Sequence, residues 1–328
     1  IFYMMVNIGG FVGPAMSSTL RTQYGWKIIF LQAAIVIGIN LIILLLFYKE
    51  KDRVKSSDTM GEAIIGSLKN MWEAVKDTRL SVLLIIMVGF WTMFNQLFYT
   101  LPTFIEDWVD TAALHNSIAQ VSPWLASFMS GGGTSINPEM LINIDAGAII
   151  VFQLLVSYFV LKMRHVSAMI TGFIIASIGI GITFYTGNGL YTILGIVIFA
   201  IGEMMTNPTF SSFIALISPK GKEALYMGTY FLPIFLGNFL TTFISGNLYQ
   251  AWSDKISLLQ TEMASRHIEM PEITKEFTKN DYFASASEKL GMTQVEMTQM
   301  VWDSYNPNKI WYVIVAIGIV TILALAIY

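Results

Sequence analysis

One acidic residue stands in the middle of a long apolar segment, residues 190–217. Asn207 and Ser211 follow Glu203 at intervals of four residues, so the three share one face of a helix. Pro208 removes a backbone donor within the same segment, which should kink the helix. An ionised acid at the centre of a bilayer costs about 2.5–3.5 kcal/mol and usually marks a functional site. We therefore expect Glu203 to bind a proton or a cation, in preference to merely joining helices through a buried partner.

A second polar face lies on the predicted helix 81–104. We expect this face to line an aqueous cavity, where Asn95, Gln96 and Tyr99 would hydrogen-bond a substrate. The alternative is simple hydrogen bonding between helices, at about 0.6 kcal/mol per contact. The polar residues that recur there at helical spacing are Thr92, Asn95, Gln96, Tyr99 and Thr103.

Further candidate residues lie on three other segments. Tyr3 and Asn7 are four residues apart and can face the same cavity. Asn238 fits either a cavity lining or ordinary packing. Asp145 lies near one end of its segment, so an interfacial cap and a site role are equally compatible with the sequence.

Several other chemistries are not expected. The chain has no cysteine, which excludes disulfides and thiol catalysis. No metal site is expected, because the histidines fall in predicted loops without ligand spacing, and no cofactor is expected either. Gly131-Gly132-Gly133-Thr134 lacks the lysine of a nucleotide-binding loop. We find no cluster of nucleophile and base that would indicate an enzyme, and the net charge of -3 argues against nucleic acid as a partner.

The elements that carry these residues are predicted to be membrane-spanning helices. Hydrophobic residues make up 55% of the chain and charged residues only 12%, about half the usual charge of a soluble domain. Long unbroken apolar runs exclude a membrane β-barrel, so the fold class is all-α, a polytopic membrane helical bundle. Eight windows of sufficient length are found: 1–20, 28–48, 81–104, 144–162, 167–186, 190–217, 224–250 and 310–328.

The distribution of lysine and arginine predicts the orientation. Residues 49–79 are rich in both, and residues 105–143 have none, so the first segment is expected in the cytoplasm. We expect an integral protein of the cell (cytoplasmic or inner) membrane with both ends of this fragment in the cytoplasm. A helical stripe of Ile64, Leu68, Trp72 and Val75 predicts a helix on the membrane surface. The polar insertion 251–309 predicts a small outer helical cap, in which Thr293 and Glu296 form a capping box.

Several motifs resemble a known family. They are similar to helices five, seven, ten and eleven of the major facilitator superfamily, and more narrowly to the proton-dependent oligopeptide transporters (POT/PTR), whose signature is FYxxxNxGS. This chain departs from that family at Gly10, Asn95 and Asp145, where the family usually has Ser, Glu and Asn. The residues that carry the resemblance are Phe2-Tyr3, Asn7, Gly9, Gly13-Pro14, Gly25-Trp26-Lys27, Phe30, Phe90-Trp91, Gln96, Gly202-Glu203, Pro208, Ser218-Pro219-Lys220, Met227-Gly228 and Leu236-Gly237-Asn238.

The resemblance implies a twelve-helix alternating-access symporter of which eight helices are present. Residues 1–48 would be the last two helices of the first six-helix half, and 49–80 the cytoplasmic linker with its amphipathic helix. Residues 81–328 would be the second half, with outer insertions 105–143 and 251–309. Glu203 would match the acid that contacts the amino terminus of a peptide substrate. The expected partners are a small-molecule substrate, protons, the lipid bilayer and the missing N-terminal helices of the same protein.

The function expected from these residues and the resemblance is secondary active transport, by proton-coupled symport of a small polar or zwitterionic solute such as a di- or tripeptide. Two alternatives remain. One is a proton-antiport exporter of amphipathic compounds. The other is a non-transporting membrane receptor that uses the outer loops.

Overall fold

The computed structural model describes residues 2–49 and 59–328, and this part of the chain is helical without a strand. Seven described helices are long and apolar enough to cross a membrane. The eighth predicted span is present as α1 (Phe2–Tyr24), but it is not one of these seven. Its asparagine, glycines, proline and hydroxyl residues lower its hydropathy. The seven spans are Trp26–Phe47, Thr78–Tyr99, Pro138–Val160, His165–Tyr185, Gly189–Ile217, Glu223–Ser265 and Pro307–Ile327.

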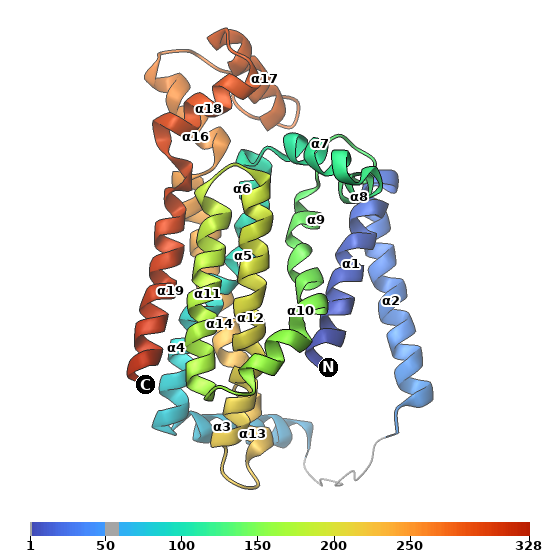
Figure 1. Ribbon diagram of the computed structural model, residues 1–328, viewed down its shortest axis with the longest axis vertical. Coiled ribbons are helices and arrows are strands. Elements are labelled where there is room, and N and C mark those ends of the chain that lie inside the picture. Colours follow the sequence, from blue (N-terminus) through green and yellow to red (C-terminus); the bar gives the residue numbers. More distant parts are fainter. Residues whose placement is uncertain (1, 50–58) are drawn as a thin grey trace.

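The main bundle consists of long helices that stand side by side (Figure 1). Its core is aromatic: the rings of Phe90 and Phe173 stack at 4.5 Å, and Phe94 contacts Phe199 at 5.4 Å. Two of the helices approach closely at Gly202, where an added Cβ would lie 2.4 Å from the Ala176 nitrogen. The bundle helices are α4 (Thr78–Phe94), α10 (Ile144–Val160), α11 (His165–Tyr185), α12 (Gly189–Ile217), α14 (Phe231–Phe243) and α19 (Ile310–Ile327).

Two windows that the sequence predicts as continuous helices are interrupted. After α4 the chain breaks at Asn95 and Thr100, giving α5 (Gln96–Tyr99) and α6 (Leu101–Trp108). The other window contains α13 (Glu223–Gly228), α14, a π-helix (Ile244–Leu248) and α15 (Tyr249–Trp252). Pro102 and Pro233 account for the breaks at Thr100 and at Tyr230, because a proline cannot donate to the carbonyl four residues earlier.

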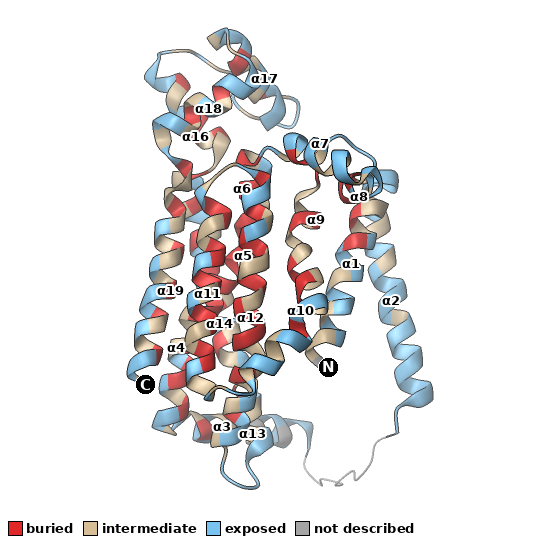
Figure 2. Cartoon of the chain, in the orientation of Figure 1, coloured by how far each residue is buried: buried red, intermediate tan, exposed pale blue. Residues whose placement is uncertain are grey.

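The first two helices form a pair beside the main bundle (Figure 1). Helix α1 packs against α10 and against α9 (Pro138–Ile142), which precedes α10. Helix α2 (Trp26–Phe47) packs on α1 and has no buried residue (Figure 2). Its exposed surface is apolar, as expected for a helix in hydrocarbon.

One end of the bundle carries α3 (Met60–Val75), which crosses beneath the long helices beside α13 (Figure 1). Ile64, Leu68 and Trp72 are exposed, whereas Ala74 is buried. The helix predicted for this segment is therefore present, and its apolar stripe is free to contact a membrane surface. The first residues of α1 and the last residues of α19 lie toward this same side of the bundle (Figure 1).

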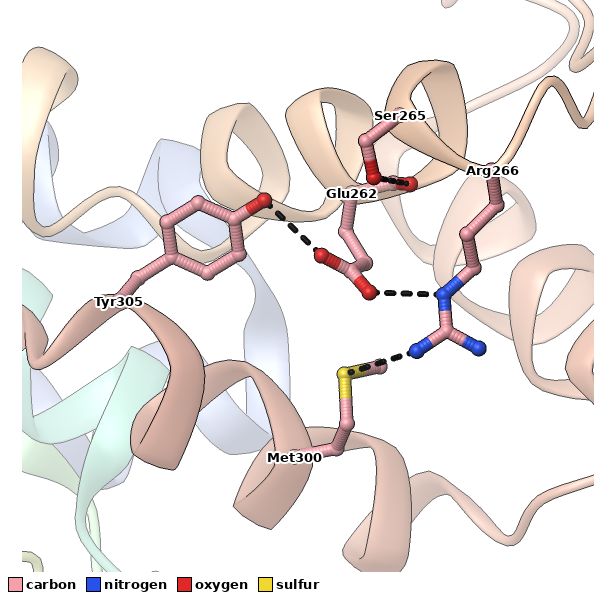
Figure 3. A network of polar contacts seen from close by, with 5 residues as sticks. All are labelled: Glu262, Ser265, Arg266, Met300 and Tyr305. Atoms are coloured by element: carbon pink, nitrogen blue, oxygen red, sulfur yellow. Dashed lines mark hydrogen bonds and ion pairs between the residues drawn. The ribbon is translucent and has the colours of Figure 1, made fainter.

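The opposite end carries two groups of short helices. Helices α7 (Thr111–Val121) and α8 (Pro123–Ser130) lie near α1 and α9. The cap contains α16 (Lys255–Ser265), α17 (Lys279–Leu290) and α18 (Gln294–Tyr305), and a 3₁₀ turn (Pro307–Lys309) leads into α19. The predicted capping box of Thr293 and Glu296 is present. In Figure 3, Glu262 of α16 accepts hydrogen bonds from Arg266 (2.7 Å) and from Tyr305 of α18 (2.9 Å).

Candidate functional site

Glu203 is the central residue of α12, a 29-residue helix. The apolar run from 189 to 217 favours a helix of this length in a bilayer. The Asn188 side chain caps its start by accepting from the Leu190 N–H, and the helix continues through Pro208 to end before Pro219. Only 4% of the Glu203 surface is exposed. The helix therefore places an acid at mid-depth and out of contact with solvent.

A chain of hydrogen bonds ends on this acid. Tyr3 of α1 donates its hydroxyl to Glu203 Oε1. Asn207 Nδ2 donates to the Tyr3 hydroxyl oxygen at 3.2 Å, and the Tyr230 hydroxyl donates to Asn207 Oδ1. All three donors point in one direction, from Tyr230 through Asn207 and Tyr3 to the carboxyl group. The chain links the α1–α2 pair to the main bundle at the level of Glu203.

A second buried acid lies against the first. Asp145 of α10 is 3% exposed, and its carboxyl group lies within hydrogen-bonding reach of the Glu203 carboxyl. Asp145 Oδ1 and Glu203 Oε2 receive no hydrogen bond from any donor in the described part of the chain. Within residues 2–49 and 59–328, neither acid forms an ion pair.

This geometry has a consequence for protonation. An ionised carboxylate only accepts hydrogen bonds, so two ionised acids would repel each other and leave both oxygens without a donor. A single proton between them removes one charge and supplies the missing donor. Paired buried carboxyl groups of this kind titrate as a unit. The arrangement is thus chemically suited to bind and release a proton.

The other predicted residues do not join this cluster through hydrogen bonds. Asn7 donates to the Tyr3 backbone carbonyl within α1 at 2.9 Å. Gln96 is fully buried and bonds to Thr92 and Thr100 of its own segment, so its polar groups are already satisfied.

The remaining three candidates differ in exposure. Tyr99 is 49% exposed, and Asn238 is partly buried on α14. Asn95 is buried at the break after α4, and its Nδ2 has no partner in the described residues. The predicted role of the polar face of 81–104 stays a prediction.

Sequence reasoning missed two features of the cluster. The spacing of polar residues does not identify Tyr230, because its partner Asn207 belongs to another helix. For Asp145 the sequence indicates the depth in the membrane but not the direction in which the side chain points. Its position opposite Glu203 depends on how α10 and α12 are rotated against each other. A buried acid without a nearby cation is the signal that should prompt a search for a second acid.

A continuous seam joins α1 to α9 and α10 above this cluster. In its middle, Asn143 Nδ2 donates to the Phe11 carbonyl at 2.8 Å. Toward the cap end, Asn137 Nδ2 donates to Ser18 Oγ at 2.9 Å. Arg21 pairs with Glu139 at 3.0 Å at the far end. The cap side of the seam is therefore closed by polar contacts.

A separate cavity lies at the cap end of the bundle. Its volume is about 1110 Å³, and it contains none of the predicted site residues. Its lining includes Asp107, Trp108, Lys255 and Trp302. The acid pair is instead enclosed between α1, α10 and α12.

Residues 1–138 match the model of the Major Facilitator Superfamily. No curated protein matches the chain. The match supports a membrane transporter of this superfamily, and the all-helical bundle with seven apolar candidate spans agrees with a polytopic protein of that type.

Proposed function

We propose that this chain belongs to a proton-coupled transporter in which Asp145 and Glu203 together form the proton-binding group. The observation that carries the proposal is the contact between these two buried acids, which lack any cation partner in the described residues. A structural role alone would be served better by an acid and a base, because buried like charges are unfavourable. A pair that shares a proton is chemically useful only if the proton can leave.

The position of the pair supports coupling to a movement of helices. Glu203 and Asp145 lie on the main bundle, whereas Tyr3 reaches them from the α1–α2 pair. Transporters of this superfamily place their sites near the membrane midplane between two halves that rock against each other. If α1 moves away from α10 and α12, Glu203 loses the Tyr3 donor and gains access to water. The proton would then be exchanged in the open state and held in the closed one.

The solute that we propose is a small polar or zwitterionic molecule such as a di- or tripeptide. With one proton shared, the pair still carries one negative charge, which can bind an ammonium group while the proton stays bound. Asn207, with Tyr230 behind it, offers neutral hydrogen-bonding groups beside the acids. The resemblance of Tyr3, Asn7 and Glu203 to oligopeptide transporter motifs points to the same class of solute.

The test is transport by the full-length protein in proteoliposomes with an imposed proton gradient. We expect the gradient to accelerate dipeptide uptake by the wild type. Glu203→Gln and Asp145→Asn should each reduce gradient-driven uptake at least tenfold. Exchange of solute across the membrane without a gradient should persist, since it needs no net proton movement. Glu106→Gln, at an exposed acid outside the spans, is the matched control and should behave as wild type.

Three outcomes would contradict the proposal in whole or in part. Unchanged pH dependence in Glu203→Gln would remove the proton role of this residue. Solute binding without any flux in either direction would favour a receptor. Efflux of amphipathic compounds in exchange for protons, with no dipeptide uptake, would keep the proton role and replace the solute.

A further inference from the structure

A narrow groove runs along the outer side of the main bundle, where α4 and α19 lie together. Its volume is about 630 Å³. Small residues create the depression: an added Cβ at Gly89 would lie 2.2 Å from Thr321 Oγ1, so the two helices meet closely at the floor. The lining residues are Gly89, Trp252, Lys309, Tyr312, Val313, Ala316, Ile317, Val320 and Thr321.

The groove is polar only at one end. Lys309 directly precedes α19 at the cap side, and its ammonium lies 5.6 Å from the Trp252 ring centre. Thr321, at the other end, donates its hydroxyl to the Ile317 carbonyl at 2.8 Å. Lys309 forms no ion pair with an acid in residues 2–49 and 59–328. One positive charge therefore lies at the cap-side end of an otherwise apolar groove.

The length of the groove matches one leaflet of a bilayer. Lys309 and Thr321 are about 12 residues apart on α19, which corresponds to about 18 Å along the helix. Half of a hydrocarbon core of about 30 Å is about 15 Å. Tryptophan, tyrosine and lysine at the cap end are typical of the membrane interface. The groove thus extends from the interface to about the midplane.

We infer that this groove binds one anionic phospholipid from the cap-side leaflet, with an acyl chain along Val313, Ala316 and Val320 and the phosphate at Lys309. The apolar walls match the chain, and the unpaired ammonium complements the head group. Trp252 stacks on Lys309 and keeps the ammonium at the mouth of the groove. The inference does not depend on the proposed transport of protons.

The experiment is native mass spectrometry of the purified protein after incubation with phosphatidylglycerol or phosphatidylcholine of identical chains. We expect stronger retention of phosphatidylglycerol. Lys309→Gln should reduce that retention about fivefold and abolish the preference. Ala316→Phe should fill the groove and reduce retention of both lipids. Lys162→Gln is the matched control, because Lys162 also stacks on an aromatic ring, Tyr158 at 3.9 Å, but outside this groove.

The outcomes distinguish selective lipid binding from non-selective retention and from dimer formation. Equal retention of the two lipids by the wild type would overturn it, as would equal losses in Lys309→Gln and Lys162→Gln. Dimers that disappear in Ala316→Phe would assign the groove to a second copy of the chain. Lys309→Gln and Ala316→Phe change exposed or partly exposed positions. An unchanged thermal unfolding curve would show that each variant is folded.

Discussion

At the scale of single residues, the environment of an acid decides its chemistry. Glu203 and Asp145 lie together without a cation in the described residues, whereas Glu262 of the cap pairs with Arg266 and accepts from Tyr305 (Figure 3). The first arrangement favours a bound proton, and the second favours a permanent charge. The sequence indicates the depth of each acid through the apolar residues around it. It does not indicate the partner, because the partner lies on another helix.

A third acid permits a prediction about pH and stability. Burial raises the pKa of Asp107 from 3.8 to about 6, although Tyr249 donates to it at 2.7 Å. The folded protein therefore binds this proton more tightly than the unfolded chain does. The contribution to stability is favourable below about pH 4 and is lost as the pH rises to about 6. Above that pH, ionised Asp107 costs up to about 3 kcal/mol.

Asp107→Asn should remove this cost. We expect the free energy of unfolding to increase by about 1–2 kcal/mol at pH 8, less than the full cost because the amide loses its attraction to Lys255. At pH 4.5 the variant should gain little or nothing. Thermal unfolding in detergent at the two pH values measures the difference. Asp303→Asn, at an exposed acid of the cap, is the control. An equal gain at both pH values would show that ionisation is not the cause.

At the scale of elements, the sequence predicts the long helices well and their interruptions poorly. Apolar runs of about 20 residues identify spans because the bilayer sets the length. The breaks before Pro102 and Pro233 were not predicted, since proline also occurs inside continuous helices, as Pro14 does in α1 and Pro208 in α12. Whether a helix breaks at proline depends on neighbours that can satisfy the freed carbonyls. That information lies in the packing of the folded chain.

Helix α3 leads to a prediction about its position on the membrane. Leu68 belongs to its exposed apolar stripe, and Glu73 is exposed on a different face. Because the chain has no cysteine, a nitroxide can be attached at Leu68→Cys or Glu73→Cys without background. In liposomes we expect the label at 68 to be relaxed mainly by oxygen, and the label at 73 mainly by a water-soluble nickel chelate. Equal exposure of both labels to the chelate would contradict a membrane-bound helix.

At the scale of the whole molecule, the seam between α1 and α10 is the place where rocking would act. An added Cβ at Gly10 would lie 4.0 Å from the Ala146 Cβ, within the range of about 3.5–4.5 Å found in disulfides. We expect Gly10→Cys combined with Ala146→Cys to form a disulfide on oxidation. Transport by the full-length protein should then fall at least tenfold and return on reduction. Mass spectrometry measures the extent of the bond.

The single-cysteine variants, treated with the same oxidant, are the controls for this experiment. Their transport should not change. Complete formation of the disulfide with undiminished transport would mean that this seam stays closed throughout the cycle. A rocking mechanism would then have to use a different surface.

The hydrogen bond from Tyr3 to Glu203 has one more consequence, which follows from thermodynamic linkage. In the proposed mechanism, the same carboxyl group takes part in proton binding and in the contact between α1 and α12. Equilibria that share a group are reciprocal: the factor by which a bound proton changes the closing constant equals the factor by which closure changes proton affinity. Proton binding and closure would then be coupled directly, without an intervening group. One oxygen atom would serve both as the sensor of the proton gradient and as part of the hinge that responds to it.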